Sequence, residues 1–480
     1  MARWRQAGWG IAVVAGLCWG CGGDGGQRAA EVAETPGDAA ATAELEAGQR
    51  LFQQGQLEAA IQHYERALAH GMDTAELHYQ FGVALLRAGQ TERAAGALDR
   101  ALKMRPDHGG AHAMLGVMLM HQGRYPEAAA ELRQAVAQEP GNAAYHEQLG
   151  ALLLAMRQQD EAVQALRQAV ALDPGRAKAW TALGDIHLHR GVLDSAQAAY
   201  GQALNADSSS AAACAGLGRV ALASRQPQRA AEMLERAVRL ERTMTAAFDW
   251  LAQAYDSLGQ RERAEKARWV YTNLQRQDEE IGQLRRELAL RPGDPTLHYN
   301  LGLLHARRRE LALAERHYLQ AIRADSTMAA AHLNLANVYA DAQRPDQALA
   351  AVRRALALNP RYALAYNSLG NIQLARMQPD SALAAYQEAI RLDPSFVSAY
   401  CNLANVQAGL GQFEAATSTL QKALALDPKS ASAHSALGNV HMMRGEHAAA
   451  VQAYSRAADL APEDEAIRRN LLAARRQAGR

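Results

Sequence analysis

The sequence repeats itself every 34 residues, and this period limits the folds that the chain can adopt. Dipeptides of leucine, alanine or phenylalanine with glycine or alanine mark the repeats. Their second residues are Gly48, Gly82, Gly116, Gly150, Gly184, Gly218 and Ala252 in one series, and Gly302, Ala336, Gly370, Ala404 and Gly438 in another. A unit of this length is one supersecondary element, which buries its apolar faces by stacking on neighbouring copies. The sequence therefore predicts an elongated stack of units and not a set of ordinary globular domains.

The two series are out of phase by sixteen residues, so the repeats fall into two blocks. The predicted repeats begin at residues 41, 75, 109, 143, 177, 211 and 245, and then at 295, 329, 363, 397 and 431. We number the residues of each repeat from its start, so that place 1 is the first residue. Block 1 is residues 41–278 with seven repeats, and block 2 is residues 295–464 with five.

Each repeat carries the pattern of two helices. In the repeat that begins at residue 177, the first apolar stripe is Trp180, Leu183, Gly184 and His187, and the second is Ala196, Tyr200 and Ala203. Both stripes have helical spacing, and Gly191 separates them. Alanine is abundant and aromatic residues are only 5% of the chain, a composition that favours helices. Many repeats end at a proline that stops the second helix, namely Pro106, Pro140, Pro174, Pro360, Pro394, Pro428 and Pro462.

Small residues at place 8 predict a close approach between the two helices of a repeat, for example Gly184 against Ala196. A large side chain there would push the helices apart, at a typical cost of about 1–3 kcal/mol. This pattern closely resembles the tetratricopeptide repeat family. The resemblance implies an all-α, right-handed superhelical solenoid of about twelve helix-turn-helix repeats, whose first helices line a concave groove.

Two departures from the pattern set the domain organisation. In the seventh repeat, Arg268 and Tyr271 replace the usual apolar residues of the second helix, and a charged stretch follows. We expect residues 260–290 to form one long helix or a helix pair that sets the phase between the blocks. The helical segment inserted between the two blocks is residues 279–294. Residues 465–480 resemble half a repeat and predict a C-terminal capping helix, because the end of a solenoid needs a polar outer face.

The N-terminus has the pattern of an export signal. Two arginines precede a short apolar run, WGIAVVAGLCWG, that is too short to span a bilayer. We predict a signal peptide at residues 1–20 and a flexible linker at residues 21–40. Cys21 resembles the acylated cysteine of bacterial lipoproteins, although Leu17 lies one place further from it than usual. This predicts a periplasmic or outer-membrane lipoprotein; plain secretion and an uncleaved anchor remain alternatives. A redox role for Cys18 and Cys21 lacks the necessary strand-helix context.

Asparagines recur on the first helices of block 2, at places that the resemblance turns towards the groove. Place 9 holds Asn337, Asn371, Asn405 and Asn439, place 6 holds Asn300, Asn334 and Asn402, and place 5 holds Asn367. A carboxamide can donate to and accept from a peptide backbone. Neighbouring helices pack about 8–10 Å apart, and three extended residues span about 10 Å. Similar ladders line the repeat superhelix of the O-linked N-acetylglucosamine transferases, where they hold extended peptide. The alternative is that these asparagines bind neighbouring helices or water.

Other site chemistries find little support. A clamp for a chaperone tail needs basic residues where Leu333, Ser398 and Asn402 stand. Histidines recur at place 4 and are interpreted as structural, and His187 and His189 diverge on one helix and make a poor metal pair. We expect no catalytic residue, metal or cofactor, because no H-E-x-x-H, phosphate loop or G-x-S-x-G is present. A formal net charge of +1 gives no general attraction to nucleic acid.

The sequence therefore predicts a non-enzymatic scaffold, exported and lipid-anchored, that binds a protein or an extended peptide. The alternative is a recognition or adaptor subunit for a separate glycosyltransferase, secretion or envelope-assembly machine. The oligomeric state and the identity of the partner do not follow from the sequence.

Overall fold

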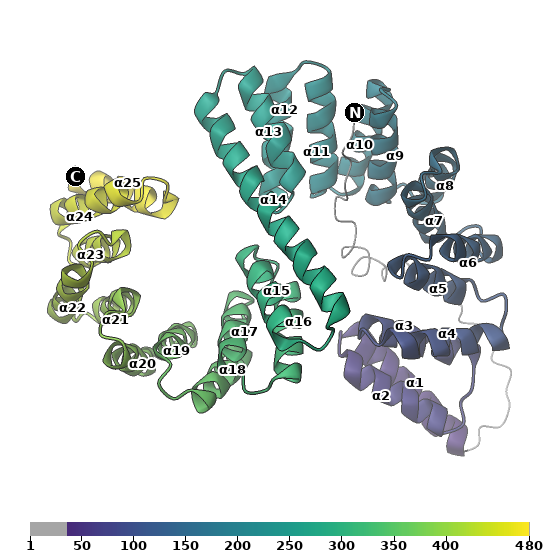
Figure 1. Ribbon diagram of the computed structural model, residues 1–480, viewed down its shortest axis with the longest axis horizontal. Coiled ribbons are helices and arrows are strands. Elements are labelled where there is room, and N and C mark those ends of the chain that lie inside the picture. Colours follow the sequence, from purple (N-terminus) through teal and green to yellow (C-terminus); the bar gives the residue numbers. More distant parts are fainter. Residues whose placement is uncertain (1–35, 480) are drawn as a thin grey trace. The chain divides into compact units, whose positions relative to one another are not determined.

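In the computed structural model, which describes residues 36–479, the regular structure consists of helices alone (Figure 1). The first helices of the repeats are α1 (Pro36–Gln53), α3 (Ala75–Arg87), α5 (Gly109–His121), α7 (Ala143–Ala155), α9 (Ala177–His189), α11 (Ala211–Ala223), α13 (Thr245–Ser257), α15 (Pro295–Arg307), α17 (Ala329–Asp341), α19 (Ala363–Ala375), α21 (Val397–Gly409) and α23 (Ala431–Met443). The second helices are α2 (Leu57–Ala69), α4 (Thr91–Met104), α6 (Tyr125–Gln138), α8 (Gln159–Leu172), α10 (Leu193–Ala206), α12 (Pro227–Leu240), α14 (Arg261–Leu290), α16 (Leu311–Ala324), α18 (Pro345–Leu358), α20 (Pro379–Leu392), α22 (Phe413–Leu426) and α24 (His447–Leu460), and α25 (Glu465–Ala478) follows them. The predicted all-α solenoid of helix-turn-helix pairs is confirmed.

The first helices begin where the period places them, with one exception. From α3 onward, each begins at the first residue of its repeat, whereas α1 begins at Pro36 and takes up the last part of the predicted linker. The predicted signal peptide at residues 1–20 and its Cys21 lie outside the described residues. No helix within residues 36–479 is both long enough and apolar enough to cross a bilayer.

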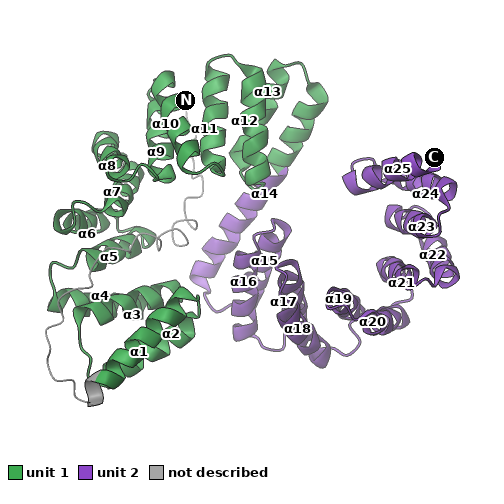
Figure 2. Ribbon diagram, turned by 180° about the vertical axis from the view of Figure 1, so that it is seen from behind, with its two compact units in different colours: residues 1–272 green, residues 273–480 purple. Residues whose placement is uncertain are grey.

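The chain divides into two compact units, residues 1–272 and residues 273–480, and the division falls within α14 (Figure 2). Within each unit, the first helix of a repeat packs against its own second helix, and the second helix packs against the next repeat. Consecutive first helices also contact each other, as α17 and α19 do, and consecutive second helices have no contacts of similar extent. The first helices therefore lie on the inner side of each stack. Figure 2 shows this for α19, α21 and α23.

The turn between the two helices of every repeat needs a left-handed residue at place 15. Glycine, which adopts this conformation without strain, fills the place in many repeats, such as Gly191 with φ of 73°. Five repeats use a residue with a side chain, for example Met377 with φ of 59°. The complete set of these side-chain residues is Arg157, Arg225, Arg309, Gln343 and Met377. The turn is thus imposed by the packing of the helices even where the sequence does not favour it.

The glycine at place 8 makes room for a side chain at place 24 of the same repeat. A Cβ atom added to Gly184 would lie 2.6 Å from the ring of Tyr200, and one added to Gly370 would lie 2.4 Å from the ring of Tyr386. The side chain that fills the space at Gly184 is Tyr200, which the spacing did not predict, and the close approach to Ala196 stays a prediction. Both tyrosines are almost fully buried, so the rings cannot move aside.

The side chain at place 4 fixes the turn that precedes its repeat. The ring nitrogen Nε2 of His112 donates to the carbonyl oxygen of Pro106 at 2.8 Å, and Nε1 of Trp180 donates to Pro174 at 3.0 Å. Equivalent bonds are made by His146, His298, His332, Tyr400 and His434. These histidines satisfy turn carbonyls that would otherwise lack a partner, in keeping with their structural interpretation.

Helix α14 is a single helix, which decides between the two forms expected for residues 260–290. Its first half belongs to the seventh repeat, where Ala267 is buried against Leu251. Arg268 stands at place 24, where other repeats bury tyrosine, leucine or valine, and it pairs with Asp256. Its second half packs Ile281 against α15. A polar residue suits place 24 here, because no helix in step with block 1 follows to cover it.

The C-terminal helix α25 has the amphipathic character expected of a cap. The carboxylate of Asp464 accepts hydrogen bonds from the first-turn amides of Ala466 and Ile467, at 2.8 and 3.1 Å. Leu471 and Ala474 are buried and pack with Tyr454 of the last repeat. The opposite face carries exposed arginines. The cap thus covers the apolar end of the stack and presents charge to solvent.

Candidate functional site

The candidate site is the asparagine ladder, which we define as Asn300, Asn334, Asn337, Asn367, Asn371, Asn402, Asn405 and Asn439. The eight side chains come from α15, α17, α19, α21 and α23, the first helices of block 2. Asn337 and Asn371 are exposed, and the other six are half-buried. Every member of the ladder therefore keeps some access to solvent on its first helix.

Two carboxamides at place 9 are held by a tyrosine of their own repeat. The Tyr386 hydroxyl donates to Oδ1 of Asn371 at 2.7 Å, and the Tyr454 hydroxyl donates to Oδ1 of Asn439 at 2.6 Å. Burial raises the pKa of Tyr386 to about 12, so its hydroxyl keeps its proton at neutral pH and remains a donor. The carboxamide oxygen is therefore occupied, and the Nδ2 group is left to face outward.

Asparagines at places 5 and 6 connect consecutive repeats. The Nδ2 group of Asn402 donates to Oδ1 of Asn367 at 3.0 Å and lies 3.4 Å from Oδ1 of Asn371. Asn334 donates to the Tyr299 hydroxyl of the preceding repeat at 3.0 Å. These three asparagines make the contacts between helices that the alternative interpretation expects, so their capacity for a ligand is smaller than predicted.

Three asparagines have no hydrogen-bond partner in the described part of the chain. These are Asn300 at place 6, and Asn337 and Asn405 at place 9. Their carboxamides are free to turn either the oxygen or the nitrogen towards a ligand. The ladder thus consists of free amides, amides with a fixed oxygen, and amides that connect repeats. Place 9 is the row with the most unused hydrogen-bonding capacity.

Exposed leucines flank the ladder on α19. Leu364 at place 2 is 52% exposed and Leu374 at place 12 is 42% exposed. Both places lie on the same side of the first helix as Asn371 in the numbering of the repeat. These leucines, and the two tyrosines that bind the asparagines at place 9, were not predicted from the sequence. The signal was present, because tyrosine at place 24 accompanies asparagine at place 9 in two repeats.

The corresponding surface of block 1 has different chemistry. Place 9 holds Val83, Val117 and Ala151 in three consecutive repeats and charged residues in the next two. The carboxylate of Asp185 accepts a hydrogen bond from Tyr200 at 2.7 Å and another from Arg219 at 3.3 Å. Block 1 therefore has the same framework without asparagine at place 9, where Gln49 and Gln253 are its only carboxamides.

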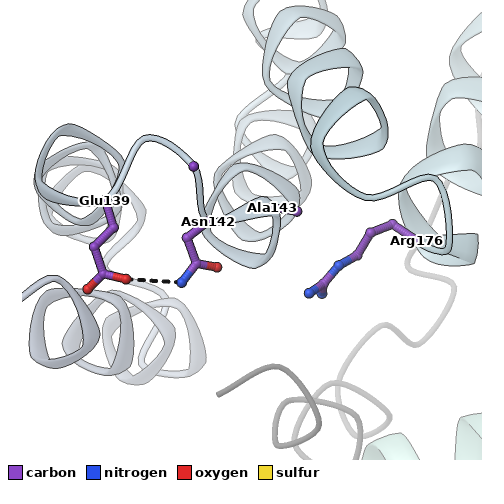
Figure 3. Close-up of a pocket in the computed structure, with 5 residues that line it drawn as sticks. Glu139, Asn142, Ala143 and Arg176 are labelled. Carbon is purple, nitrogen blue, oxygen red and sulfur yellow. Dashed lines mark hydrogen bonds between the residues drawn. The ribbon is translucent and has the colours of Figure 1, made fainter. Parts of the chain in front are cut away.

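A hollow in the first unit lies at the turns between repeats, and no residue at place 9 lines it (Figure 3). It is lined by Glu139, Asn142 and Arg176. Asn142 donates to the Glu139 carboxylate at 3.2 Å, and Arg176 pairs with Asp173 at 3.0 Å. These polar groups are already paired within their own turns, so the hollow offers no convergent set of groups for a ligand.

Three histidines meet in the first repeat of block 2. The Nδ1 atoms of His298 and His317 lie 3.2 Å apart, and the rings of His305 and His317 are stacked. Nδ1 of His305 lies 2.5 Å from the Glu310 carboxylate. Burial lowers the pKa of His317 to about 3, with smaller contributions from neighbouring positive charges. Within residues 36–479, no group of three or more such side chains has the geometry of a metal site.

The family now follows from matches to known sequences. A tetratricopeptide repeat model matches residues 79–143, 281–329, 333–395 and 401–465, which together cover just over half of the chain. Two further models of the repeat match residues 48–89 and 153–220. The chain belongs to the tetratricopeptide repeat family. Arrays of this kind are typically non-catalytic scaffolds for protein interaction, because stacked repeats present a long continuous surface.

Three solved structures are among those to which this chain is similar. PilF of Pseudomonas aeruginosa is 21% identical, with a TM-score of 0.40, and the match covers 43% of this chain and 94% of that one. Yeast Tom70 is 17% identical, with a TM-score of 0.36, and the match covers 92% of this chain and 96% of Tom70. MamA of Desulfovibrio magneticus RS-1 is 27% identical, with a TM-score of 0.32, over 35% and 96%. No curated protein matches the sequence.

Proposed function

We propose that this tetratricopeptide repeat protein binds an extended protein segment along the first helices of block 2, with place 9 as the main row of contacts. The observation that carries the proposal is the unused hydrogen-bonding capacity of Asn337, Asn371, Asn405 and Asn439 in four consecutive repeats. An extended backbone presents unpaired donors and acceptors that match these carboxamides. The ladder reads a backbone, so it accepts many sequences.

The strength of such binding can be bounded. A neutral hydrogen bond contributes about 0.5–1.5 kcal/mol net, so four carboxamides give about 2–6 kcal/mol. Micromolar binding needs about 8 kcal/mol. Covering Leu364 and Leu374, which are about half exposed, adds roughly 1 kcal/mol each. The ladder and leucines together therefore support binding near or weaker than micromolar, with the apolar contacts adding preference for some sequences.

The decisive experiment measures binding of the full chain to an immobilised array of unstructured 15-residue peptides. The variant N371A/N405A/N439A removes three place-9 carboxamides. Its matched control is Q387A/Q421A/Q452A, which removes three exposed carboxamides from the second helices of the same repeats. We expect weaker binding across the array for the first variant only. Unchanged binding, with helicity retained, would reject the ladder as the site.

We further propose that the protein is exported and held at a membrane by acylation of Cys21, as the N-terminal pattern indicates. Cys21→Ser should release the protein from the membrane fraction while leaving export intact. Continued membrane association of a correctly cleaved C21S protein would reject the anchor. If a stable catalytic partner co-purifies from the membrane, the adaptor role replaces that of an independent scaffold.

A further inference from the structure

The repeats of block 2 alternate between two ways of presenting the place-9 asparagine. The repeats that begin at residues 363 and 431 combine glycine at place 8 with tyrosine at place 24. The repeats that begin at residues 329 and 397 combine alanine at place 8 with Val352 and Leu420 at place 24. The alternation explains why a motif returns after two repeats, as in NLANV at residues 334–338 and 402–406.

The tyrosines have little freedom to do anything but hold the asparagine. Tyr386 and Tyr454 are 1% and 3% exposed, and each ring lies against the glycine at place 8 of its repeat. The Tyr386 hydroxyl donates to Asn371, and the Tyr454 hydroxyl donates to Asn439. Neither hydroxyl has another hydrogen-bond partner among residues 36–479. The ring is thus fixed by packing, and it fixes the direction of the carboxamide.

A free carboxamide can offer a ligand either its acceptor oxygen or its donor Nδ2 group, but a carboxamide whose oxygen is already bound offers mainly the donor. Its Nδ2 group points away from the tyrosine and can only donate. By contrast, Asn337 and Asn405 face a valine and a leucine at place 24, so either end of the carboxamide can meet a ligand. The surface therefore alternates between fixed donors and adaptable groups.

We propose that Tyr386 and Tyr454 are positioning residues that make Asn371 and Asn439 dedicated donors to carbonyl oxygens of the bound peptide backbone, whereas Asn337 and Asn405 accept either polarity. This inference rests on the proposed function, and it adds which place-9 asparagines donate to the ligand and which can either donate or accept. Preorganised donors bind more tightly than donors that must first be ordered. The alternation also sets which backbone groups of the ligand face each repeat.

The same geometry with a different residue occurs in block 1. The Tyr200 hydroxyl donates to Asp185 at place 9 as Tyr386 does to Asn371, at the same distance of 2.7 Å. The carboxylate offers no N–H group, so this repeat cannot donate to a carbonyl oxygen. An aspartate at place 9 is therefore compatible with the framework and incompatible with the proposed contact.

The first test compares two pairs of tyrosine substitutions. Y386F/Y454F removes the hydroxyls that hold the asparagines and leaves the rings against their glycines. The matched control Y64F/Y318F removes buried hydroxyls at place 24 of repeats where place 9 holds Gln49 and Leu303. The probe is the tightest-binding peptide of the array described above, labelled with fluorescein. We expect about threefold to tenfold weaker binding for Y386F/Y454F and no change for the control.

The second test asks whether the hydroxyls act through the ligand's carbonyl groups. The probe is resynthesised with every second amide bond replaced by an ester, which weakens the carbonyl acceptors. If the tyrosines position donors, the ester replacement reduces the peptide affinity of the native protein by a larger factor than that of Y386F/Y454F. Equal losses in the two proteins would mean that the hydroxyls only support packing, and would overturn the proposal.

A third variant covers the case in which the tyrosine changes disturb folding. N371D/N439D keeps an acceptor for each tyrosine, as Asp185 does for Tyr200, and removes the donors. We expect binding to fall by about tenfold or more. Loss of binding in N371A/N405A/N439A with full binding in Y386F/Y454F and N371D/N439D would overturn the donor assignment and leave the proposed function intact. Full binding in all of these variants would overturn both.

Discussion

Blocks 1 and 2 share one framework and differ in what their first helices present at place 9. In both blocks a small residue at place 8 receives a buried side chain from place 24, as Gly184 receives Tyr200 and Gly370 receives Tyr386. At place 9 block 1 has Val83, Val117 and Ala151 in three consecutive repeats, whereas block 2 has asparagine in four. Packing requires the first pattern in every repeat except the seventh, where place 24 is Arg268. The second pattern varies freely, which is typical of a surface used for recognition.

The difference also shows how a half-buried polar residue can serve both packing and binding. Asn402 connects its repeat to Asn367 of the repeat before it, and Asn405, three residues later on the same helix, has no partner in the described structure. A ladder of identical residues is therefore not a ladder of identical roles. Position within the repeat decides which amide stabilises the stack and which remains available.

The largest expected effect tests the shared framework. Gly184→Val and Gly370→Val place side-chain atoms where a Cβ would already lie 2.6 and 2.4 Å from a buried ring. We expect each to destabilise its own repeat by about 3 kcal/mol, measured by hydrogen exchange and thermal unfolding. The control is Gly201→Val, because nothing lies within 4 Å of a Cβ at this helical position. Similar loss in all three variants would contradict the packing argument.

The next effect tests the difference between the blocks. The variant N371V/N405V/N439V gives block 2 the apolar place 9 of block 1. Removing three hydrogen bonds to the ligand should weaken peptide binding by about 2 kcal/mol, or roughly thirtyfold, with the helical content retained. Some stability is lost as well, because Tyr386 and Tyr454 lose the acceptors of their buried hydroxyls. Binding that is equal or stronger would show that the apolar surface is the working one, and attention would move to block 1.

Acid should loosen the first repeat of block 2 before the repeats of block 1. Burial holds the folded pKa of His317 at about 3, whereas an unfolded histidine titrates near 6.5. As pH falls from 6.5 towards 3, only the unfolded state takes up the proton, so folding stability falls by up to about 1.4 kcal/mol per pH unit. Positive charge on the neighbouring groups contributes further to the lowered pKa of His317, namely that of His305, Arg316, His298 and Arg285.

Hydrogen exchange at pH 7 and pH 5 measures this prediction. Protection in α15 and α16 should fall more steeply with acid than protection in block 1. His317→Phe removes the titrating group and should flatten the dependence in that repeat. An unchanged pH profile in H317F would assign the acid response to other groups.

The smallest effect concerns the turns. Met377 occupies a left-handed position with φ of 59° and is 86% exposed, so it makes few contacts that a substitution could lose. Met377→Gly should stabilise its repeat by about 0.5 kcal/mol, since relief of strain exceeds the entropy cost of glycine. Gly411→Met, at φ of 78° in the next repeat, should cost a similar amount or more. In thermal unfolding, Met377→Gly should raise the melting temperature and Gly411→Met should lower it.

Much of the fold could be predicted because each repeat encodes it again. The start of α3 and of each later first helix could be predicted from the period, the helical spacing of the two stripes and the positions of the prolines. The same reasoning did not identify Tyr200 as the side chain beside Gly184, because spacing along one helix does not say which side chain of the other helix fills the space. It also left α14 open between one helix and two, since a charged stretch is compatible with either.

For the candidate site, the sequence alone determined which residues recur at place 9 and that block 2 differs there from block 1. Only the tertiary structure separated Asn371, held by Tyr386, from Asn405, which is free, and from Asn402, which connects two repeats. The physical reason is that periodicity reports the face of a helix on which a residue lies. A hydrogen bond depends on a second helix, which lies fifteen or more residues away in the chain and is brought close only by packing.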